Sequence, residues 1–287
     1  MDYSIAFPHL HIYLEHVGKS VEIFGIKIAY YGIIIAVGMI VAMIFLSYEA
    51  RRIQEDSGLY LDYAMFVIVF GFIAARIYYV AFSWDIYKND LISIFNFREG
   101  GIGVYGGLIG AFITALIFTR VKKMNFFKAA DVAVLCMLIG QIFGRWGNFF
   151  NREAFGEYTD SLFAMRLPLS AVRYSDVTNL MRQHSVDGYI QVTPTFLYES
   201  MWNLLLFILL MAYRKHKKYN GQIMLLYFLG YGIGRFWIES LRTDQLKIPV
   251  VGWPISMVIA AVTVTVSLAA LIVLGVKKKK VHAGLVK

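Results

Sequence analysis

Long apolar stretches alternate with short polar connections along this chain. Three stretches contain no charged residue and cover residues 28–48, 102–119 and 248–276. Four others contain one or two charged residues each and cover residues 63–84, 129–151, 192–213 and 221–241. A bilayer core about 30 Å thick requires about 20 mostly apolar residues in a helix. The pattern therefore predicts seven transmembrane helices.

The composition supports this interpretation. Apolar residues make up 59% of the 287 residues and charged residues only 16%, whereas soluble domains have about 25% charged residues. The mean hydropathy is +0.60. An aromatic content of 16% excludes a disordered chain, because such chains are poor in aromatic residues. We therefore expect an all-α integral membrane protein.

Basic residues are concentrated on one side of the predicted membrane. Fifteen of the 28 lie in the first, third and fifth connections and the C-terminal tail: Arg51, Arg52, Arg120, Lys122, Lys123, Lys128, Arg214, Lys215, Lys217, Lys218, Lys277, Lys278, Lys279, Lys280 and Lys287. Basic connections mark the cytoplasmic side, so seven spans place the N-terminus outside and the C-terminus inside. The formal charge of +9 therefore indicates orientation and contact with lipid headgroups rather than a nucleic-acid-binding surface.

One connection is much longer than the others. Residues 152–191 exceed the length usual between helices and are rich in charged residues. We expect them to form a small external head, with a few short strands within 162–169 and 189–192. The helical body would then comprise residues 1–151 and 192–287.

Charged residues within the predicted spans point to a functional site, because an ionisable group at membrane depth costs several kcal/mol. One helix face of the sixth span carries Tyr231, Arg235, Glu239 and Arg242 at helical spacing. A structural ion pair between Arg235 and Glu239 is one interpretation. A binding surface is the other, because the polar stripe extends beyond that pair at both ends.

A second polar face lies in the fourth span and consists of Gln141, Arg145 and Asn148. It continues into a segment with Asn151, Glu153 and Gly156 near the predicted outer surface. Two arginines on facing helices suit a phosphate diester, because the planar guanidinium binds phosphate through two hydrogen bonds and stays charged when partly desolvated.

The third span begins in a glycine-rich segment, residues 100–110. It lacks the Gly-Lys-Ser/Thr sequence of a P-loop, and its glycines favour close helix packing. Tyr105 is the exception within it, a phenol at the external end of a span from which a shared cavity is within reach.

The sequence offers no convincing metal or disulfide chemistry. Cys136 is the only cysteine, so no intramolecular disulfide is possible. The N-terminal histidines His9, His11 and His16 lack the carboxylate or cysteine pattern that completes a metal site. We expect neither a metal nor another cofactor.

Two segments carry a resemblance to a known family. Residues 144–156 resemble the G-R-x-G-N-F-x-N-x-E-x-x-G signature of bacterial prolipoprotein diacylglyceryl transferases at every fixed position. Residues 231–242 resemble the family's Y-G-x-x-R-F-x-x-E-x-x-R stretch. Further positions that fit are Tyr31, Gly32, Ala130, Asp131, Pro194, Thr195, Leu197, Tyr198 and Glu199. The similarity extends over nearly the whole chain.

The resemblance implies a reaction at the outer leaflet of the bacterial cytoplasmic membrane. The diacylglyceryl group of phosphatidylglycerol is transferred to the thiol of the lipobox cysteine in a preprolipoprotein signal peptide, which forms a thioether and releases glycerol 1-phosphate. The implied partners are these two substrates and membrane lipids, with no nucleic acid. The catalytic candidates are Arg145, Arg235, Glu239 and Tyr105. The phosphatidylglycerol-binding candidates are Tyr31, Arg145, Asn148, Asn151, Glu153, Gly156, Tyr231, Arg235 and Arg242.

Two positions depart from the family pattern. Some members have histidine in H-G-G-L, where this chain has Tyr105, and in H-P-T/S-Q-L-Y-E, where it has Thr193. None of the six histidines lies within a predicted span, so we do not expect an intramembrane histidine base. Our hypothesis is that Tyr105 orients the thiol or the phosphate while the arginines lower the pKa of the thiol, which is ordinarily about 8.5.

Two other classes of protein are compatible with charged spans. A transporter or channel requires a polar path to both faces, yet the polar residues of the fourth and sixth spans cluster toward the outer half, with Asp131 as the exception. A structural scaffold uses the charges only to pin helices together, and would tolerate lysine in place of arginine.

Overall fold

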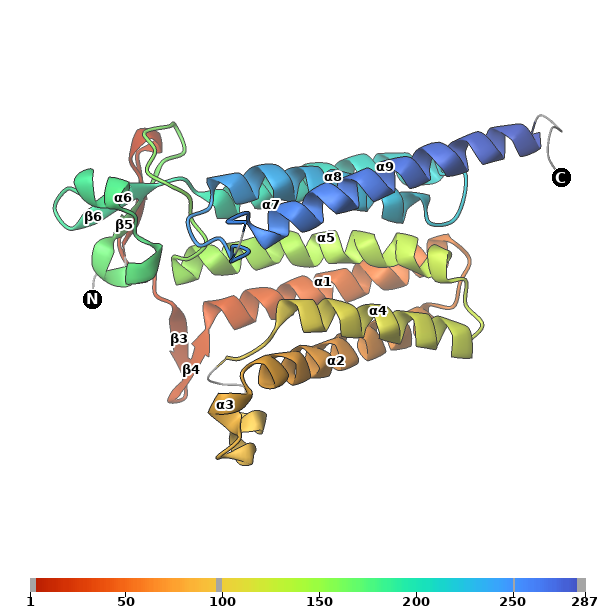
Figure 1. The fold of residues 1–287 in the computed structure, drawn as a ribbon, viewed down its shortest axis with the longest axis horizontal. Helices are drawn as coiled ribbons and strands as arrows, with labels where there is room; N and C mark the ends of the chain where they lie inside the picture. Colours follow the sequence, from red (N-terminus) through yellow and green to blue (C-terminus); the bar gives the residue numbers. More distant parts are fainter. Residues whose placement is uncertain (1–3, 97–99, 250, 283–287) are drawn as a thin grey trace. The chain divides into compact units, whose positions relative to one another are not determined.

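The computed structural model describes residues 4–96, 100–249 and 251–282, with side chains described as far as Lys278. The chain divides into two compact units, each described here by itself. One comprises residues 1–42 and 134–287, and the other comprises residues 43–133. Both boundaries fall inside long helices, α1 and α5 (Figure 1).

Helices dominate the described residues. The long ones are α1 (Tyr30–Arg52), α2 (Ser57–Phe82), α4 (Val104–Val121), α5 (Phe126–Asn151), α7 (Thr195–Tyr213), α8 (Gln222–Leu241) and α9 (Ile255–His282). The short ones are η1 (Pro8–Leu10), α3 (Trp84–Tyr87), η2 (Leu91–Phe95), η4 (Leu169–Ala171), η5 (Tyr174–Asp176), α6 (Asn179–Gln183) and η6 (Arg214–His216). Six of these seven helices are long and apolar enough to cross a membrane. Helix α8 is the one that does not meet this criterion.

The surfaces of these helices are those of a membrane protein. In the most apolar 18-residue segment of α1, and in that of α9, only 11% is buried within the protein. Ile40 and Ile44 of α1, for example, are 60% and 66% exposed. Apolar surface on this scale is not tolerated by a soluble monomer but matches lipid acyl chains. The expected helical membrane class is thereby confirmed.

Five of the long helices begin later than the apolar stretches predict, α4 by two residues and α8 by one. The predicted start at residue 28 falls in strand β4 (Ile26–Ala29), so α1 begins at Tyr30. Helix α7 begins at Thr195 and α9 at Ile255, each directly after a proline. A proline favours extended backbone in the residue before it and lacks a backbone N–H, so helices commonly begin beside one.

Within residues 43–133, α2 and α4 pack through glycine. A Cβ atom on Gly106 would lie 2.1 Å from the Cβ of Tyr78, and one on Gly110 would lie 2.2 Å from the Cβ of Ala74. The predicted packing role of the glycine-rich segment is confirmed. Arg76 of α2, buried despite its charge, donates to the carbonyl groups of Ile94, Gly100 and Gly101 and two others in the loop before α4.

Small residues also bring α7 and α8 together in the other unit. The indole of Trp202 covers Gly234, where an added Cβ would lie 2.1 Å from its Nε1 atom. The same Nε1–H donates to the carbonyl of Gly230 at 3.0 Å. On the opposite face of α8, Gly232 lies against Val264 of α9. These contacts fix the position of α8 between two neighbouring helices.

Six short strands are described besides the helices. A four-stranded antiparallel sheet has the order β2-β1-β5-β6, with β1 (Ile5–Phe7), β2 (Ile12–Leu14), β5 (Met165–Pro168) and β6 (Tyr189–Val192). A separate hairpin pairs β3 (Ser20–Ile23) with β4. Strands β5 and β6 lie within the expected head, whereas β1 and β2 extend it with residues that precede α1. We call residues 5–14 and 152–192 the head.

The core of the head continues into the helices. Buried side chains of β1, β5 and β6 pack with Phe149 near the end of α5 and Phe196 near the start of α7, whose rings lie 5.1 Å apart. Arg152, only 1% exposed, donates to the carbonyl groups of Phe150 and Val17. The last turn of α5 is therefore held by apolar packing and by the N-terminal segment.

The close approach of α2 and α4 generates a stability prediction. Gly106→Ala places a methyl group against backbone-proximal atoms that cannot rotate away, and overpacking of this kind costs about 1–3 kcal/mol. We expect a lower thermal unfolding midpoint in detergent. Gly275→Ala in α9 is the matched control, because apart from the backbone of its own helix no described heavy atom lies within 4 Å of its added Cβ. Equal midpoints for the two variants would contradict the packing described.

Candidate functional site

A buried carboxylate joins two arginines from different helices. Glu199 of α7 has Oε1 2.8 Å from an Nη atom of Arg145 on α5 and Oε2 3.3 Å from an Nη atom of Arg235 on α8. The Glu199 side chain is 4% exposed, and those of Arg145 and Arg235 are 22% and 19% exposed. The two arginines predicted to act together therefore converge on one group.

A second carboxylate completes the group. Glu239 follows Arg235 by one helical turn, and its Oε2 lies 2.7 Å from Arg235 Nη2. We call Arg145, Glu199, Arg235 and Glu239 the arginine–glutamate cluster. Its two positive and two negative charges compensate each other, which is necessary because an uncompensated buried charge is strongly destabilising. The ion pair of Arg235 with Glu239, one of the two interpretations of this helix face, is present, within a larger network.

The contacts leave hydrogen-bonding capacity in the cluster. Among the described residues, the well-aligned hydrogen bonds of the two guanidinium groups are long, from Arg235 to Glu199 at 3.3 Å and from Arg145 to the Asn148 amide oxygen at 3.4 Å. Glu199 Oε1 and Glu239 Oε2 lie within ion-pair distance but accept no aligned hydrogen bond. Because a guanidinium carries five N–H donors, both arginines retain donors for another oxygen-rich group.

Close helix packing explains why Glu199 meets Arg235. Trp202 lies three residues after Glu199 and packs on Gly234, the residue before Arg235. A larger residue at 234 would push α7 away from α8. Gly147 acts similarly beside Arg145, because an added Cβ there would lie 2.3 Å from the ring of Tyr31. Tyr31 is thus placed against the signature segment.

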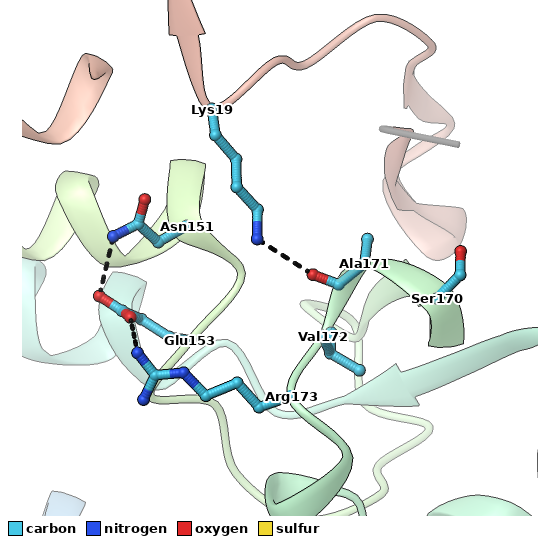
Figure 2. A pocket seen from close by; sticks show the side chains of 7 residues that line it. All are labelled: Lys19, Asn151, Glu153, Ser170, Ala171, Val172 and Arg173. Carbon is cyan, nitrogen blue, oxygen red and sulfur yellow. Dashed lines mark hydrogen bonds and ion pairs between the residues drawn. The ribbon is translucent and has the colours of Figure 1, made fainter. Parts of the chain in front are cut away.

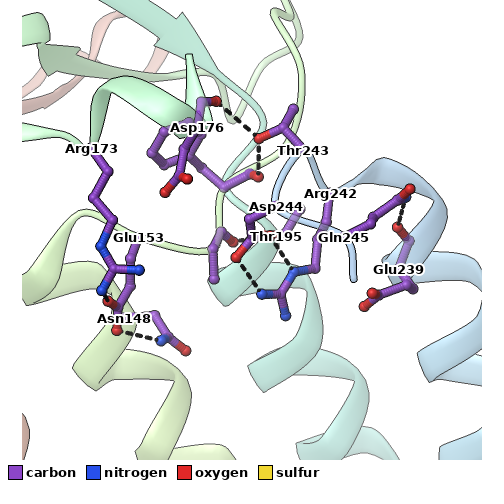
Figure 3. Close-up of polar contacts among 12 residues, drawn as sticks. Asn148, Glu153, Arg173, Asp176, Thr195, Glu239, Arg242, Thr243, Asp244 and Gln245 are labelled. Atoms are coloured by element: carbon purple, nitrogen blue, oxygen red, sulfur yellow. Dashed lines mark hydrogen bonds and ion pairs between the residues drawn. The ribbon is translucent and has the colours of Figure 1, made fainter. Parts of the chain in front are cut away.

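The polar face of α5 continues into the loop that follows it. Glu153 Oε1 accepts hydrogen bonds from the side-chain amides of Asn148 at 3.0 Å and Asn151 at 3.2 Å. Glu153 Oε2 accepts from Arg173 at 3.3 Å (Figure 3). Since Asn148 also accepts from Arg145, a chain of polar contacts runs from the arginine–glutamate cluster to the head.

Arg242 lies just after the end of the helix that carries the other residues of its predicted polar face. Helix α8 ends at Leu241, and Arg242 forms a two-pronged pair with Asp244 at 2.9 and 2.8 Å (Figure 3). Burial opposes ionisation of Asp244, but the hydrogen bonds and charge of Arg242 outweigh it and lower the pKa of that carboxyl. The backbone of Gly156 bridges to Arg242, and an added Cβ would lie 2.5 Å from the Leu241 carbonyl. Gly156 therefore permits the loop to meet the end of α8.

Two tyrosines of α8 and one amide side chain of α5 border the cluster. Tyr231 stacks on Tyr227 with ring centroids 5.5 Å apart and lies within electrostatic range of Glu199, Arg145 and Arg235. The Tyr227 hydroxyl accepts a hydrogen bond from Gln141 at 2.8 Å. Two residues of the polar face predicted on α5 thus contact neighbouring helices, Gln141 through Tyr227 of α8 and Arg145 through Glu199 of α7.

Some residues of the site were not among the predicted site residues. Glu199 fitted the resemblance, and it is the only charged residue of its span, which is a signal of function in itself. Asn203, one turn further along α7, is fully buried, and neither of its amide atoms has a hydrogen-bond partner in the described part of the protein. Tyr105 lies in the first turn of α4, in the other compact unit.

The fold and the site together define a class. The protein is a multi-pass membrane protein with a buried arginine–glutamate cluster that retains donors for an oxygen-rich anion. Residues 19–273 match the model of the family described as prolipoprotein diacylglyceryl transferase. The chain belongs to this family.

Relatives with curated names agree with the family match. The phosphatidylglycerol–prolipoprotein diacylglyceryl transferase of Clostridioides difficile is 44% identical over 226 residues, which cover 79% of this chain and 83% of the relative. The enzyme of the same name from Listeria welshimeri is 42% identical, with 79% of each chain covered. That of Oceanobacillus iheyensis is 41% identical over 79% of this chain and 77% of the relative.

The central position of Glu199 generates a second stability prediction. Glu199→Gln removes the charge that compensates both arginines, and loss of one partner of a buried pair costs about 3–5 kcal/mol. We expect a clearly lower thermal unfolding midpoint in detergent. Glu15→Gln is the control, because Glu15 is exposed. A Glu199→Gln protein as stable as the control would contradict a structural role for the bridge.

Proposed function

We propose that this protein transfers the diacylglyceryl group of phosphatidylglycerol to the thiol of a lipobox cysteine in a preprolipoprotein. The names of its relatives supply both substrates. The observation that carries the proposal is the convergence of Arg145 and Arg235 on Glu199, with N–H donors of both guanidinium groups left over. A phosphate diester presents the oxygen atoms that such donors bind.

The reaction is a displacement at carbon. The thiolate sulfur attacks the glycerol carbon that bears the phosphate, a C–S bond forms and the C–O bond breaks. The leaving oxygen keeps the bonding electron pair, so negative charge grows on the phosphate as glycerol 1-phosphate departs. Fixed positive charge next to that oxygen stabilises the transition state more than the ground state. Arg145 and Arg235 supply this charge.

The carboxylates of the cluster have a complementary task. Without lipid, Glu199 and Glu239 hold the guanidinium groups in place and compensate their charge. When phosphatidylglycerol binds, its phosphate takes the remaining donors and the arginines need not move far. Glu239 is therefore a catalytic candidate through its hold on Arg235. Asn148, Asn151 and Glu153 orient Arg145 and the headgroup, while Tyr31, Tyr231, Gly156 and Arg242 shape the surrounding surface.

The proposed membrane arrangement has seven spans, with α8 as the seventh. Helix α8 is less apolar than the others, but its Arg235 and Glu239 are paired inside the protein, which reduces the cost of placing them in a bilayer. The basic connections are cytoplasmic. The N-terminus, the head and the active site then face the outer leaflet of a bacterial cytoplasmic membrane, where translocated signal peptides emerge.

The proposed role of Tyr105 rests on its position in the sequence. Where some family members have histidine, this chain offers a phenol at the start of α4. In this proposal the Tyr105 hydroxyl orients the thiol or the phosphate, while the positive charge of the arginines lowers the pKa of the incoming thiol.

A transfer assay tests the proposed function. Purified protein is incubated with phosphatidylglycerol labelled in its acyl chains and with a lipobox peptide. We expect a labelled peptide whose diacylglyceryl group is attached through a thioether, together with one glycerol 1-phosphate per peptide. Absence of this product from correctly folded protein would contradict the proposal and favour a transporter.

Arginine geometry is tested with Arg145→Lys and Arg235→Lys. Lysine keeps the charge but loses the planar pair of donors, and loss of one such transition-state interaction lowers the rate about 10²–10³-fold. We expect both variants to lose most of their turnover in the transfer assay and to keep the unfolding midpoint close to that of the unchanged protein. Near-normal turnover in either variant would argue that the charges only pin helices.

Tyr105→Phe tests the phenol separately. Removal of the hydroxyl should lower the transfer rate, because the thiol or phosphate loses a hydrogen-bonding partner. Tyr174→Phe provides the control, since Tyr174 is 78% exposed in the head. A full transfer rate in Tyr105→Phe would exclude the proposed role.

A further inference from the structure

A cavity of about 420 Å³ lies beside the loop that follows α5. Figure 2 shows its wall, to which the end of α5, the residue before strand β3 and the loop around η4 contribute. The lining residues are Lys19, Asn151, Glu153, Ser170, Ala171, Val172 and Arg173. All of them belong to one compact unit.

The charges around this cavity favour an anion. Lys19 and Arg173 are positive, and Glu153 is the only acidic residue in the wall. Both Glu153 oxygens are already occupied, Oε1 by two amides and Oε2 by Arg173. Within the described part of the chain, the Lys19 ammonium group donates one hydrogen bond, to the Ala171 carbonyl at 3.3 Å. Because an ammonium group carries three donors, Lys19 can also bind a ligand oxygen.

Neutral polar groups complete the wall. The Ser170 hydroxyl and the Asn151 amide oxygen form no hydrogen bond within the described part of the chain, although the Asn151 amide nitrogen donates to Glu153. Only Ala171 and Val172 contribute apolar side chains. A ligand that combines one anionic group with hydroxyl groups matches this lining, whereas acyl chains do not.

A chain of hydrogen bonds connects the cavity with the arginine–glutamate cluster. Glu153 lines the cavity and accepts from Asn148, which in turn accepts from Arg145. A phosphate at Arg145 is thus separated from the cavity by one amide and one carboxylate. A group that leaves the phosphate site therefore has a second polar site within reach along this chain of contacts.

We propose that this cavity binds the glycerophosphate group. The proposal rests on the proposed function, because removal of the diacylglyceryl group from phosphatidylglycerol leaves glycerol 1-phosphate. Lys19 and Arg173 bind the phosphate, and Ser170 and Asn151 bind the hydroxyl groups. The same chemistry has two sources. One is the free product, whose phosphate Lys19 and Arg173 bind, and the other is the headgroup of the intact lipid, of which only the terminal hydroxyl groups reach the cavity while its phosphate stays at Arg145 and Arg235. The cavity is ample for this group, since pockets of about 300–1,000 Å³ hold much larger ligands.

The test is direct binding of glycerol 1-phosphate to the purified full-length protein, measured by calorimetry in nanodiscs that lack phosphatidylglycerol. We expect saturable binding that weakens about tenfold in the double variant Lys19→Gln/Arg173→Gln, because two charge-assisted contacts are lost. Lys27→Gln is the matched control, because Lys27 lies in the hairpin that directly follows Lys19 and does not line the cavity. It should bind like the unchanged protein.

Further measurements separate the two sources of the group. If KM for phosphatidylglycerol and Kd for glycerol 1-phosphate increase equally in the double variant, the cavity binds the headgroup of the intact lipid. An increase in Kd and in the product-inhibition constant, with KM unchanged, assigns it to the free product. Lys19→Gln alone should also weaken the binding of glycerol 1-phosphate. This single change leaves the Arg173–Glu153 pair intact.

Two outcomes overturn the proposal. One is undiminished binding of glycerol 1-phosphate by the double variant, and the other is equally tight binding of inorganic phosphate, which lacks the hydroxyl groups. Because the binding measurement needs no turnover, failure of the transfer assay contradicts the proposed function separately. If the unchanged protein is a fully active transferase and the double variant binds glycerol 1-phosphate equally tightly, only the cavity assignment is contradicted.

Discussion

The bridge from Glu199 to Arg145 and Arg235 is the contact on which the rest of the site depends. Three helices supply one charged residue each, and the carboxylate lies between two guanidinium groups that would otherwise repel each other. With Glu239 the group is electrically neutral, so it can remain largely buried in a membrane protein. Few of its contacts are aligned hydrogen bonds. A site held by charge in this way keeps its donors available for a ligand.

The scaffold makes this bridge possible through small residues and through the head. Gly234 allows Trp202 of α7 to lie directly on the backbone of α8, which brings Glu199 and Arg235 within contact distance. Gly147 of α5 admits the ring of Tyr31 from α1 in the same way, beside Arg145. The core of the head holds the last turn of α5 and the first turn of α7 through Phe149 and Phe196. The glycines and aromatic residues of the signature are therefore structural requirements of the same site.

Much of this arrangement follows from the sequence, and the missing parts have physical reasons. Helical spacing predicts that Arg235 and Glu239 share a face, because neighbours within one helix are set by periodicity. The pairing of Glu199 with both arginines depends on how three helices pack, which periodicity does not reveal. Strands β1 and β2 have three residues each, too few for an alternating pattern to stand out. Burial of Arg152 likewise depends on the carbonyl of Val17, which is remote in the sequence.

An experimental structure with phosphatidylglycerol bound, determined in nanodiscs without a peptide substrate, is the most direct test of the central claim. In the absence of a thiol the lipid remains intact at its site. The account predicts phosphate oxygens within hydrogen-bonding distance of both Arg145 and Arg235. A phosphate bound elsewhere, with both guanidinium groups still engaged only by Glu199, Glu239 and Asn148, would contradict it.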